Sequence, residues 1–291
     1  NSLAQEYAVF TNWHCEVPTC TFPNRTFYHA GTSAGRVDND LTYNYAWDND
    51  LPNLFDLFTE KNVPWKCYFP KDQVIPLTAI NLAGARHLDL WRDHTEYMPD
   101  FYNDCANGTL PAYSWVEPTM QTGDTNDYHP PEDVRAGEAL LAKIYNAVRT
   151  SPAWEDTALV IMWDEHGGTY DHVVPPAAIP PDDIEGEEGF KFDRYGIRVP
   201  FIVVSAHTKQ GTVIRDLHSN TSLTRTLREL FDLGPELSRR EGAAKTIEAA
   251  FNRSQPRKDM HELHPLAYTP GVANPDAQEP VIGDRPDAAL L

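Results

Sequence analysis

Two adjacent carboxylates stand directly after an apolar segment in the middle of the chain. Residues 158–162 (Ala-Leu-Val-Ile-Met) predict a short buried strand, and Asp164 and Glu165 follow it, ahead of two glycines. Open α/β sheets bind their ligands at the carboxyl ends of strands. Because neighbouring carboxylates repel each other and are costly to bury without a cation, the pattern indicates a metal site. A solvated exit from strand to loop is the structural alternative.

A threonine near the start of the chain offers a hydroxyl group for nucleophilic chemistry. Pro23 interrupts any continuous strand there, so Thr21 is expected at the start of a turn into the next element. A threonine hydroxyl is a poor nucleophile until a metal or a base takes its proton. The ordinary structural role for Thr21 would be to cap the N-terminus of a helix.

Histidines in two further loops are candidates for proton transfer. Asp127 and His129 project from a loop that two prolines stiffen, and as a pair they could bind a second metal or protonate a leaving group. Helix capping by Asp127 is the alternative. His218 stands just before a predicted helix, at a strand-to-helix connection that suits a site, although a lone histidine is more often structural.

The elements that must position these groups alternate between helix and strand. Apolar spacing predicts helices over 51–62 and 132–150, and short apolar runs predict strands over 63–69 and 196–205. Such alternation favours the α/β class, with a central, mostly parallel sheet sandwiched by helices. We expect one domain over residues 1–250 and an extended, Pro-rich C-terminal arm over residues 251–291.

The composition argues against some classes of partner. The chain has 291 residues, and its 24 basic and 43 acidic residues give a net charge of −19. That charge argues against nucleic acid or an anionic membrane surface as the main partner, while a local metal site can still attract a phosphate-bearing substrate. No apolar run approaches the roughly 20 residues that a membrane-spanning helix needs, so no transmembrane segment is expected.

Four cysteines and several Asn-x-Ser/Thr sequences bear on the compartment. Cys15 and Cys20 could close a short loop, and Cys67 could meet Cys105, but the pairing stays open. We expect a secreted or periplasmic protein with two disulfides. We expect an upstream segment to be missing, because the sequence opens on a helical pattern over residues 3–10 and not on a signal-peptide pattern. The acceptor asparagines are Asn24, Asn107, Asn220 and Asn252.

Several longer motifs follow one another in an order that resembles a known family. It is the phosphoesterase family that includes bacterial phosphocholine-preferring phospholipases C, plant non-specific phospholipases C and an acid phosphatase, within the alkaline phosphatase-like superfamily. The resemblance spans roughly residues 1–235 and implies an alkaline phosphatase-like fold. The motifs are Thr-Phe-Pro-Asn-Arg (21–25), Leu-Pro (110–111), Ser-Trp-Val-Glu-Pro (114–118), Asn-Asp-Tyr-His-Pro-Pro (126–131), Asp-Glu-His-Gly-Gly (164–168), Asp-His-Val (171–173) and Gly-Ile-Arg-Val-Pro (196–200).

The resemblance implies a role for each candidate residue. Thr21 matches the nucleophile that ligates the metal and becomes phosphorylated, and Asp164 and Glu165 match acidic metal ligands. The implied cofactor is a divalent metal ion: Mg, Ca or Mn suits oxygen ligands, whereas histidine participation favours Zn. The histidines that match those of the family are His129, His172 and His218. Asn39 corresponds to an amide that holds a phosphate oxygen.

The resemblance also implies a metal-dependent phosphoric ester hydrolase that forms a phosphothreonine intermediate. We expect phospholipase C-type cleavage of phospholipids. The alternatives are an acid phosphatase that acts on phosphomonoesters and a catalytically inactive relative that binds phosphate-bearing ligands. The family places a Glu-Asn pair of further metal ligands well upstream of the nucleophile, and the 20 residues before Thr21 contain no such motif. Either the sequence is a truncated or processed product, or the metal site is incomplete.

Overall fold

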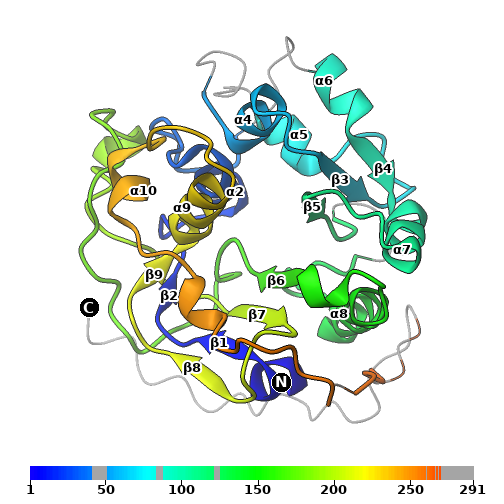
Figure 1. Cartoon of the computed structure of the whole chain (residues 1–291). Helices are drawn as coiled ribbons and strands as arrows, with labels where there is room; N and C mark the ends of the chain where they lie inside the picture. The colour runs from blue at the N-terminus through cyan, green and yellow to red at the C-terminus, as the bar shows by residue number, and fades with distance from the viewer. Residues whose placement is uncertain are drawn as a thin grey trace.

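The described strands of the chain are divided among three sheets, with helices packed around them (Figure 1). The computed structural model describes residues 1–40, 51–82, 88–120, 125–259, 261–265, 267 and 269. Within these residues the sheets have the strand orders β6-β7-β1-β8, β2-β9 and β4-β3-β5. The strands are β1 (Ala8–Phe10), β2 (Trp13–His14), β3 (Trp65–Phe69), β4 (Thr95–Tyr97), β5 (Tyr113–Val116), β6 (Ala158–Met162), β7 (Phe201–Ser205), β8 (Thr212–Ile214) and β9 (His218–Ser219).

Parallel pairing is the commoner kind among these strands. β8 runs parallel to β1, β9 runs parallel to β2, and both β4 and β5 run parallel to β3. β7 is antiparallel to its neighbours β1 and β6, and it is buried along its whole length, as expected for an inner strand of a covered sheet. The α/β class is therefore confirmed, and β6 occupies the predicted residues 158–162.

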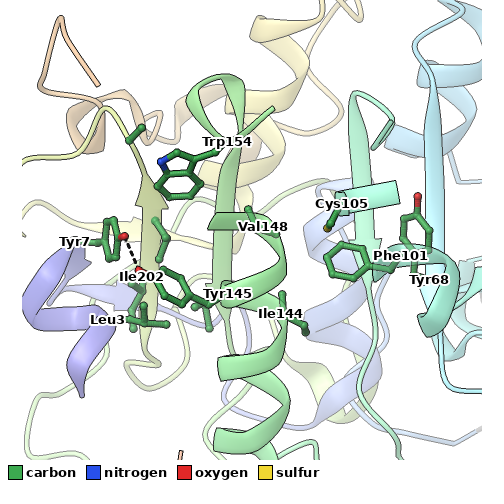
Figure 2. Packing of buried hydrophobic residues seen from close by; sticks show 13 residues of the cluster. Leu3, Tyr7, Tyr68, Phe101, Cys105, Ile144, Tyr145, Val148, Trp154 and Ile202 are labelled. Carbon is green, nitrogen blue, oxygen red and sulfur yellow. Dashed lines mark hydrogen bonds between the residues drawn. The ribbon is translucent and has the colours of Figure 1, made fainter. Parts of the chain in front are cut away.

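A long helix lies between the four-stranded sheet and the three-stranded sheet. α8 (Val134–Arg149) falls within the predicted range 132–150, and its buried side chains share one apolar cluster with residues of β3 and β7. Figure 2 shows Tyr145 and Val148 of this helix between Ile202 on one side and Tyr68 on the other. The described strands of the two sheets are not hydrogen-bonded to one another, so the central sheet that the sequence predicts is divided.

Shorter helices complete the layers on either side of α8. Figure 1 shows α4, α5 and α6 around β3, and α2 beside α9, with α2 also in contact with α4 and α5. The helices other than α8 are α1 (Ser2–Glu6), α2 (Thr21–Ala30), α4 (Leu54–Glu60), α5 (Leu77–Leu82), α6 (Leu88–Asp93), α7 (Met98–Asn107), α9 (Asn220–Leu230) and α10 (Arg239–Ala243), with 3-10 turns at Trp154–Asp156, Glu187–Gly189 and Glu248–Ala250. None of the described helices is long and apolar enough to cross a membrane.

The helix that carries Thr21 begins at that residue. Cys20, in an extended conformation, is the N-cap of α2, so Thr21 is the first helical residue and not the cap. Pro23 is tolerated in the first turn because the N–H that it lacks would have no partner within the helix. This placement leaves the Thr21 side chain at the positive end of the helix dipole.

The expected disulfides do not form, and all four cysteines are free thiols. Cys67 and Tyr68 are consecutive on β3, so their side chains point to opposite faces of the sheet. Cys105 packs in the cluster of Tyr68, whereas Cys67 packs in the cluster of α4, so the two thiols face apart. Cys15 donates instead to the carbonyl oxygen of Val17 at 3.3 Å. A secreted or periplasmic location stays a prediction without support from disulfides.

The residues after position 250 lie along α1 and α8. The described residues of this segment up to 265 contain no helix or strand beyond position 250. Arg257 Nη2 lies 3.0 Å from a carboxylate oxygen of Glu6, and Asn146 Nδ2 of α8 donates to the carbonyl oxygen of Leu263 at 2.9 Å. The division of the chain into a domain and a C-terminal arm stays a prediction, and residues 271–291 lie outside the described residues.

A buried ion pair fixes the segment that leads into α2. Glu16 Oε2 lies 2.8 Å from Arg240 Nη1, and both side chains are completely shielded from solvent. The other oxygen of Glu16 accepts from the backbone N–H of Thr221 in the first turn of α9, at 2.7 Å. Arg240 also donates to the carbonyl oxygens of Glu16, Ile179 and Phe192. The pair therefore ties α9 and α10 to the chain just before Thr21.

Replacing Arg240 by methionine is expected to lower the free energy of unfolding by about 3–5 kcal/mol, because it leaves the Glu16 carboxylate buried and unpaired. The matched control is Arg239→Met on the neighbouring position, whose ion pair with Asp183 is exposed. That variant should lose less than about 1 kcal/mol. Denaturant unfolding followed by circular dichroism measures both, and equal losses would contradict the role given to the Glu16–Arg240 pair.

Candidate active site

The loop that leaves β6 carries the two acidic residues, and helices α2 and α9 hold its backbone. Tyr28 of α2 donates its hydroxyl to the carbonyl oxygen of Trp163 at 3.2 Å. Asn220 of α9 directs its amide nitrogen at the carbonyl oxygen of Asp164, at 3.4 Å. The Asn220 side chain is itself oriented by Trp13, whose indole N–H donates to it at 3.0 Å. The end of β6 therefore meets the helix that carries the candidate nucleophile.

One ion pair brings Thr21 and Asp164 to the same place. Arg25 Nε lies 3.1 Å from Asp164 Oδ2, and both side chains are largely buried. Thr21 and Arg25 are separated by four positions on α2, so their side chains lie on the same face of the helix, one turn apart. The carboxylate that Arg25 binds therefore lies on the face of α2 that carries the Thr21 hydroxyl.

Glu165 is a carboxylate with little compensation for its charge. Its side chain is 10% exposed, and burial raises the pKa of the Glu165 carboxyl above its ordinary value. The backbone N–H of Gly167, which donates to Oε2 at 2.6 Å, lowers this pKa again, and the neighbouring charge of Asp164 raises it. The Glu165 carboxylate also contributes to a raised pKa of the Cys20 thiol, for which burial is the largest cause.

The loop over residues 126–131 packs against the acidic loop. Gly167 has a φ of 60°, and a Cβ atom there would meet the ring of Pro130 at 2.8 Å, so glycine allows the close approach. This contact places His129 near Glu165, and a positive charge on His129 favours the ionised form of that carboxyl. His129 is exposed, and its Nδ1 lies 2.7 Å from the carbonyl oxygen of Pro130. Since a carbonyl only accepts, Nδ1 carries a proton and Nε2 of neutral His129 keeps its lone pair.

Asn39 lies beside Thr21 at the N-terminus of α2. Its Oδ1 accepts from the backbone N–H of Phe22 at 2.8 Å, which leaves the amide Nδ2 with both of its protons. Arg36 orients the segment around Asn39 by donating to the carbonyl oxygens of Asp38 and Asp40 at 3.0 and 2.7 Å. Asn39 is therefore a fixed donor next to the candidate nucleophile.

A group of polar atoms around the start of α2 makes no hydrogen bond within the part of the chain that the structure describes. One of these atoms belongs to the first helical residue. Each of the others belongs to a side chain whose second polar atom is already hydrogen-bonded to the protein, so that side chain is oriented and its remaining polar atom is available. Such atoms are suited to bind a ligand with several oxygens, such as a phosphate group. They are Thr21 Oγ1, Asn39 Nδ2, His129 Nε2, Asp164 Oδ1 and Glu165 Oε1.

The surroundings of two histidines that the sequence places in the site give no support to a role in the chemistry. His218 is buried between aromatic rings, with its ring centroid 5.9 Å from that of Trp13, and both of its nitrogens face backbone carbonyls, those of Asp216 and Thr246. That arrangement leaves no nitrogen for a substrate. The side chain of His172 is 81% exposed, and its charged neighbour is Asp171, at 3.6 Å. We therefore leave both histidines out of the chemistry proposed below.

The donor set suits a hard divalent cation in chemistry but falls short of a full ligand shell. Asp164, Glu165 and Thr21 offer oxygen atoms, which Mg, Ca and Mn accept as ligands. The raised pKa of Glu165 indicates charge that a cation would offset. Among the described residues, no three His, Cys, Asp or Glu side chains gather closely enough to hold an ion. Among the described residues, the site therefore offers two carboxylates and one hydroxyl as metal ligands.

Sequence reasoning missed two residues of the site. Arg25 belongs to the Thr-Phe-Pro-Asn-Arg motif, and its spacing of four from Thr21 on a predicted helix was the available signal. His166 adjoins Glu165, and its Nδ1 is buried, 3.5 Å from Glu165 Oε2, and has no hydrogen-bond partner. For His166 the available signal was its place in the Asp-Glu-His-Gly-Gly motif, whereas its burial depends on how the loop folds.

Comparisons with known proteins agree with the motif order. The model of the Phosphoesterase family matches residues 1–234. A relative from Arabidopsis thaliana, named non-specific phospholipase C3, is 35% identical over 274 residues, which cover 88% of this chain and 51% of the relative. The chain therefore spans about half the length of that relative.

One solved structure shares the fold at low sequence identity, and another is similar to a lesser degree. The crystal structure of Ps i-CgsB matches with a TM-score of 0.50 and 14% identity, covering 85% of this chain and 68% of the other. A protein from Vibrio parahaemolyticus, described as being in the alkaline phosphatase superfamily, matches with a TM-score of 0.47 and 12% identity, covering 86% and 64% of the two chains.

Replacing Glu165 by glutamine is expected to raise the free energy of unfolding of the metal-free protein at pH 7. A carboxyl whose pKa is higher in the folded state stabilises that state only at low pH, and this contribution is lost as the pH rises through the folded-state pKa. The ionised Glu165 therefore destabilises the fold at neutral pH, and glutamine removes that charge while keeping an acceptor for Gly167.

Urea unfolding of the metal-free protein over a pH series tests this expectation. The gain from Glu165→Gln should shrink as the pH falls toward the ordinary range of a carboxyl. Glu60→Gln, at an exposed position on α4, is the control and should change stability by less than about 0.5 kcal/mol. A loss of stability in Glu165→Gln at pH 7 would show that the Glu165 charge is compensated.

Proposed function

Because the chain belongs to the Phosphoesterase family, we propose that it hydrolyses phosphoester bonds by using Thr21 as the nucleophile and forming a phosphothreonine intermediate. The observation that carries the proposal is that Arg25 of α2 binds Asp164 and Phe22 of α2 binds Asn39, which holds both side chains against the helix that begins at Thr21. Phospholipids are the substrates we favour, with phospholipase C-type cleavage, because the relatives that match over most of this chain are named phospholipases C.

The start of α2 suits the phosphoryl group that Thr21 would attack. The positive end of the helix dipole favours the negative phosphoryl oxygens, and Asn39 Nδ2 can donate to one of them. Thr21 Oγ1 makes no hydrogen bond among the described residues, so the oxygen is free to approach phosphorus opposite the leaving alcohol. The Oγ1–P bond forms as the bond from phosphorus to the alcohol oxygen breaks.

His129 is suited to move protons in both halves of the reaction. With Nδ1 bonded to the carbonyl oxygen of Pro130, the imidazolium form can donate from Nε2 to the departing alcohol. The neutral ring that remains has a lone pair on Nε2, which accepts a proton from the water that attacks the phosphothreonine. That step releases phosphate or a phosphorylated head group, restores the imidazolium and frees the Thr21 oxygen, which takes back from solvent the proton that its hydroxyl released to solvent before the attack.

Asp164, Glu165 and the Thr21 hydroxyl are the groups we propose as ligands of a divalent cation, whose identity we leave among Mg, Ca, Mn and Zn. A cation bound there would lower the pKa of the Thr21 hydroxyl and offset charge on the phosphoryl oxygens. Arg25 keeps the Asp164 carboxylate in place through Oδ2, while Oδ1 remains available.

Hydrolysis of p-nitrophenylphosphorylcholine beside p-nitrophenyl phosphate tests the proposal, with each divalent metal supplied in turn. We expect the wild type to cleave the choline diester and Thr21→Ala to lose on the order of 10³-fold or more in kcat, because the nucleophile is gone. Thr21→Ser is the matched control, since it keeps a hydroxyl at the same position and should keep most of the activity.

Acid quenching during turnover should trap a phosphoryl group on Thr21, which peptide mass spectrometry can locate. Cleavage of the monoester alone would move the assignment to a phosphatase of phosphomonoesters. Unchanged diester cleavage in Thr21→Ala would exclude Thr21 as the nucleophile. Absence of cleavage of both esters with every metal would favour a protein that binds phosphate-bearing ligands without turning them over.

A further inference from the structure

A buried carboxylate with a full set of donors lies behind the site. Glu117, which follows β5, is 1% exposed. Its Oε2 accepts from the backbone N–H of Leu77 at 2.7 Å, and its Oε1 accepts from the N–H of Thr78 at 2.9 Å and the indole N–H of Trp115 at 3.2 Å. The Thr78 hydroxyl also donates to Oε1. Glu117 therefore caps the N-terminus of α5 and has no freedom to turn.

Arg25 connects this fixed carboxylate to the site. Its Nη1 lies 3.5 Å from Glu117 Oε1, and its Nε lies 3.1 Å from Asp164 Oδ2. The side chain is buried, and Nη2 points at the sulfur of Met120 at 3.4 Å. A planar guanidinium holds its donors in a fixed geometry, so a carboxylate at one edge determines where the other edge points.

The three residues belong to three parts of the fold. Glu117 lies at the end of β5 in the three-stranded sheet, Asp164 lies at the end of β6 in the four-stranded sheet, and Arg25 lies on α2 between them. These sheets share no strand among the described residues. Arg25 is therefore a side-chain connection across the junction that sets the position of Asp164 relative to Thr21.

We propose that Arg25 is a positioning residue for the candidate metal ligand Asp164. Anchored by Glu117, the guanidinium occupies Asp164 Oδ2, whereas Oδ1 makes no hydrogen bond among the described residues and is the oxygen that would face a cation. Arg25 itself touches neither substrate nor metal. This role deepens the proposed function and rests on it, because it concerns how the same site binds its cation.

A purely structural ion pair would stabilise the fold without affecting the site, so the test needs a readout other than stability. We choose calorimetric titration of Mn²⁺ into the metal-free protein, together with kcat and KM for p-nitrophenylphosphorylcholine. Arg25→Lys keeps the charge but replaces the planar fork by one ammonium group on a flexible stem, which cannot hold both carboxylates in a fixed geometry. The variant should bind Mn²⁺ about 10- to 100-fold more weakly and lose kcat with little change in KM.

Arg257→Lys is the matched control. Arg257 is also buried and also bridges two carboxylates, those of Glu6 and Asp259, but it lies beside α1, away from Thr21. It should lose stability without a change in Mn²⁺ affinity or kcat. If Arg25→Lys does not fold, Glu117→Gln carries the same test, since it removes the charge that anchors the guanidinium and should weaken Mn²⁺ binding in the same direction.

The outcomes separate the two proposals. A wild type that binds Mn²⁺ and cleaves the diester, beside a folded Arg25→Lys that matches it in both, overturns the positioning role alone. A wild type that neither binds Mn²⁺ nor cleaves either ester overturns the proposed function and this role with it. Weaker Mn²⁺ binding in Arg25→Lys and unchanged binding in Arg257→Lys support the role.

Discussion

Buried negative charge is the constraint that organises this acidic protein. The described acidic residues that are shielded from solvent are Glu16, Glu117 and Glu241, and each is paired with an arginine. Each also accepts backbone N–H groups at or just before the start of a helix, where the dipole favours an anion: α9 for Glu16, α5 for Glu117 and α10 for Glu241. Burial of a carboxylate is thus offset twice, by a guanidinium and by a helix end.

Glu165 is the carboxylate that departs from this pattern. Its side chain is nearly as shielded, yet its partners are one backbone N–H and the ring of His166, and no arginine reaches it among the described residues. The adjacent Asp164 has Arg25, so the uncompensated charge is confined to one residue beside Thr21. A fold that gives an arginine to Glu16, Glu117 and Glu241 and none to Glu165 favours a cation, or a proton, at Glu165.

The sequence predicts well what depends on local patterns. The apolar run at 158–162 forms β6 and the helical spacing of 132–150 forms α8, because burial follows these periodicities directly. The sequence does not show contacts between side chains that are distant from each other along the chain. His218 stands before a helix as a site histidine would, but Trp13, far away in sequence, packs on its ring. The predicted pairing of Cys67 with Cys105 is wrong, because the sequence alone does not show which face of the sheet the Cys67 side chain takes.

The site is divided between a shielded half and a solvent-facing half, and this division matches the chemistry. Arg25 and Glu117 are buried behind Asp164, where a low dielectric strengthens the charge interactions that fix the ligand. Asn39 and His129 come from loops and are exposed, where a substrate can arrive and protons can exchange with water. Because the buried half belongs to helices and strand ends, changes in the exposed loops can alter which ester is accepted without moving Thr21 or Asp164.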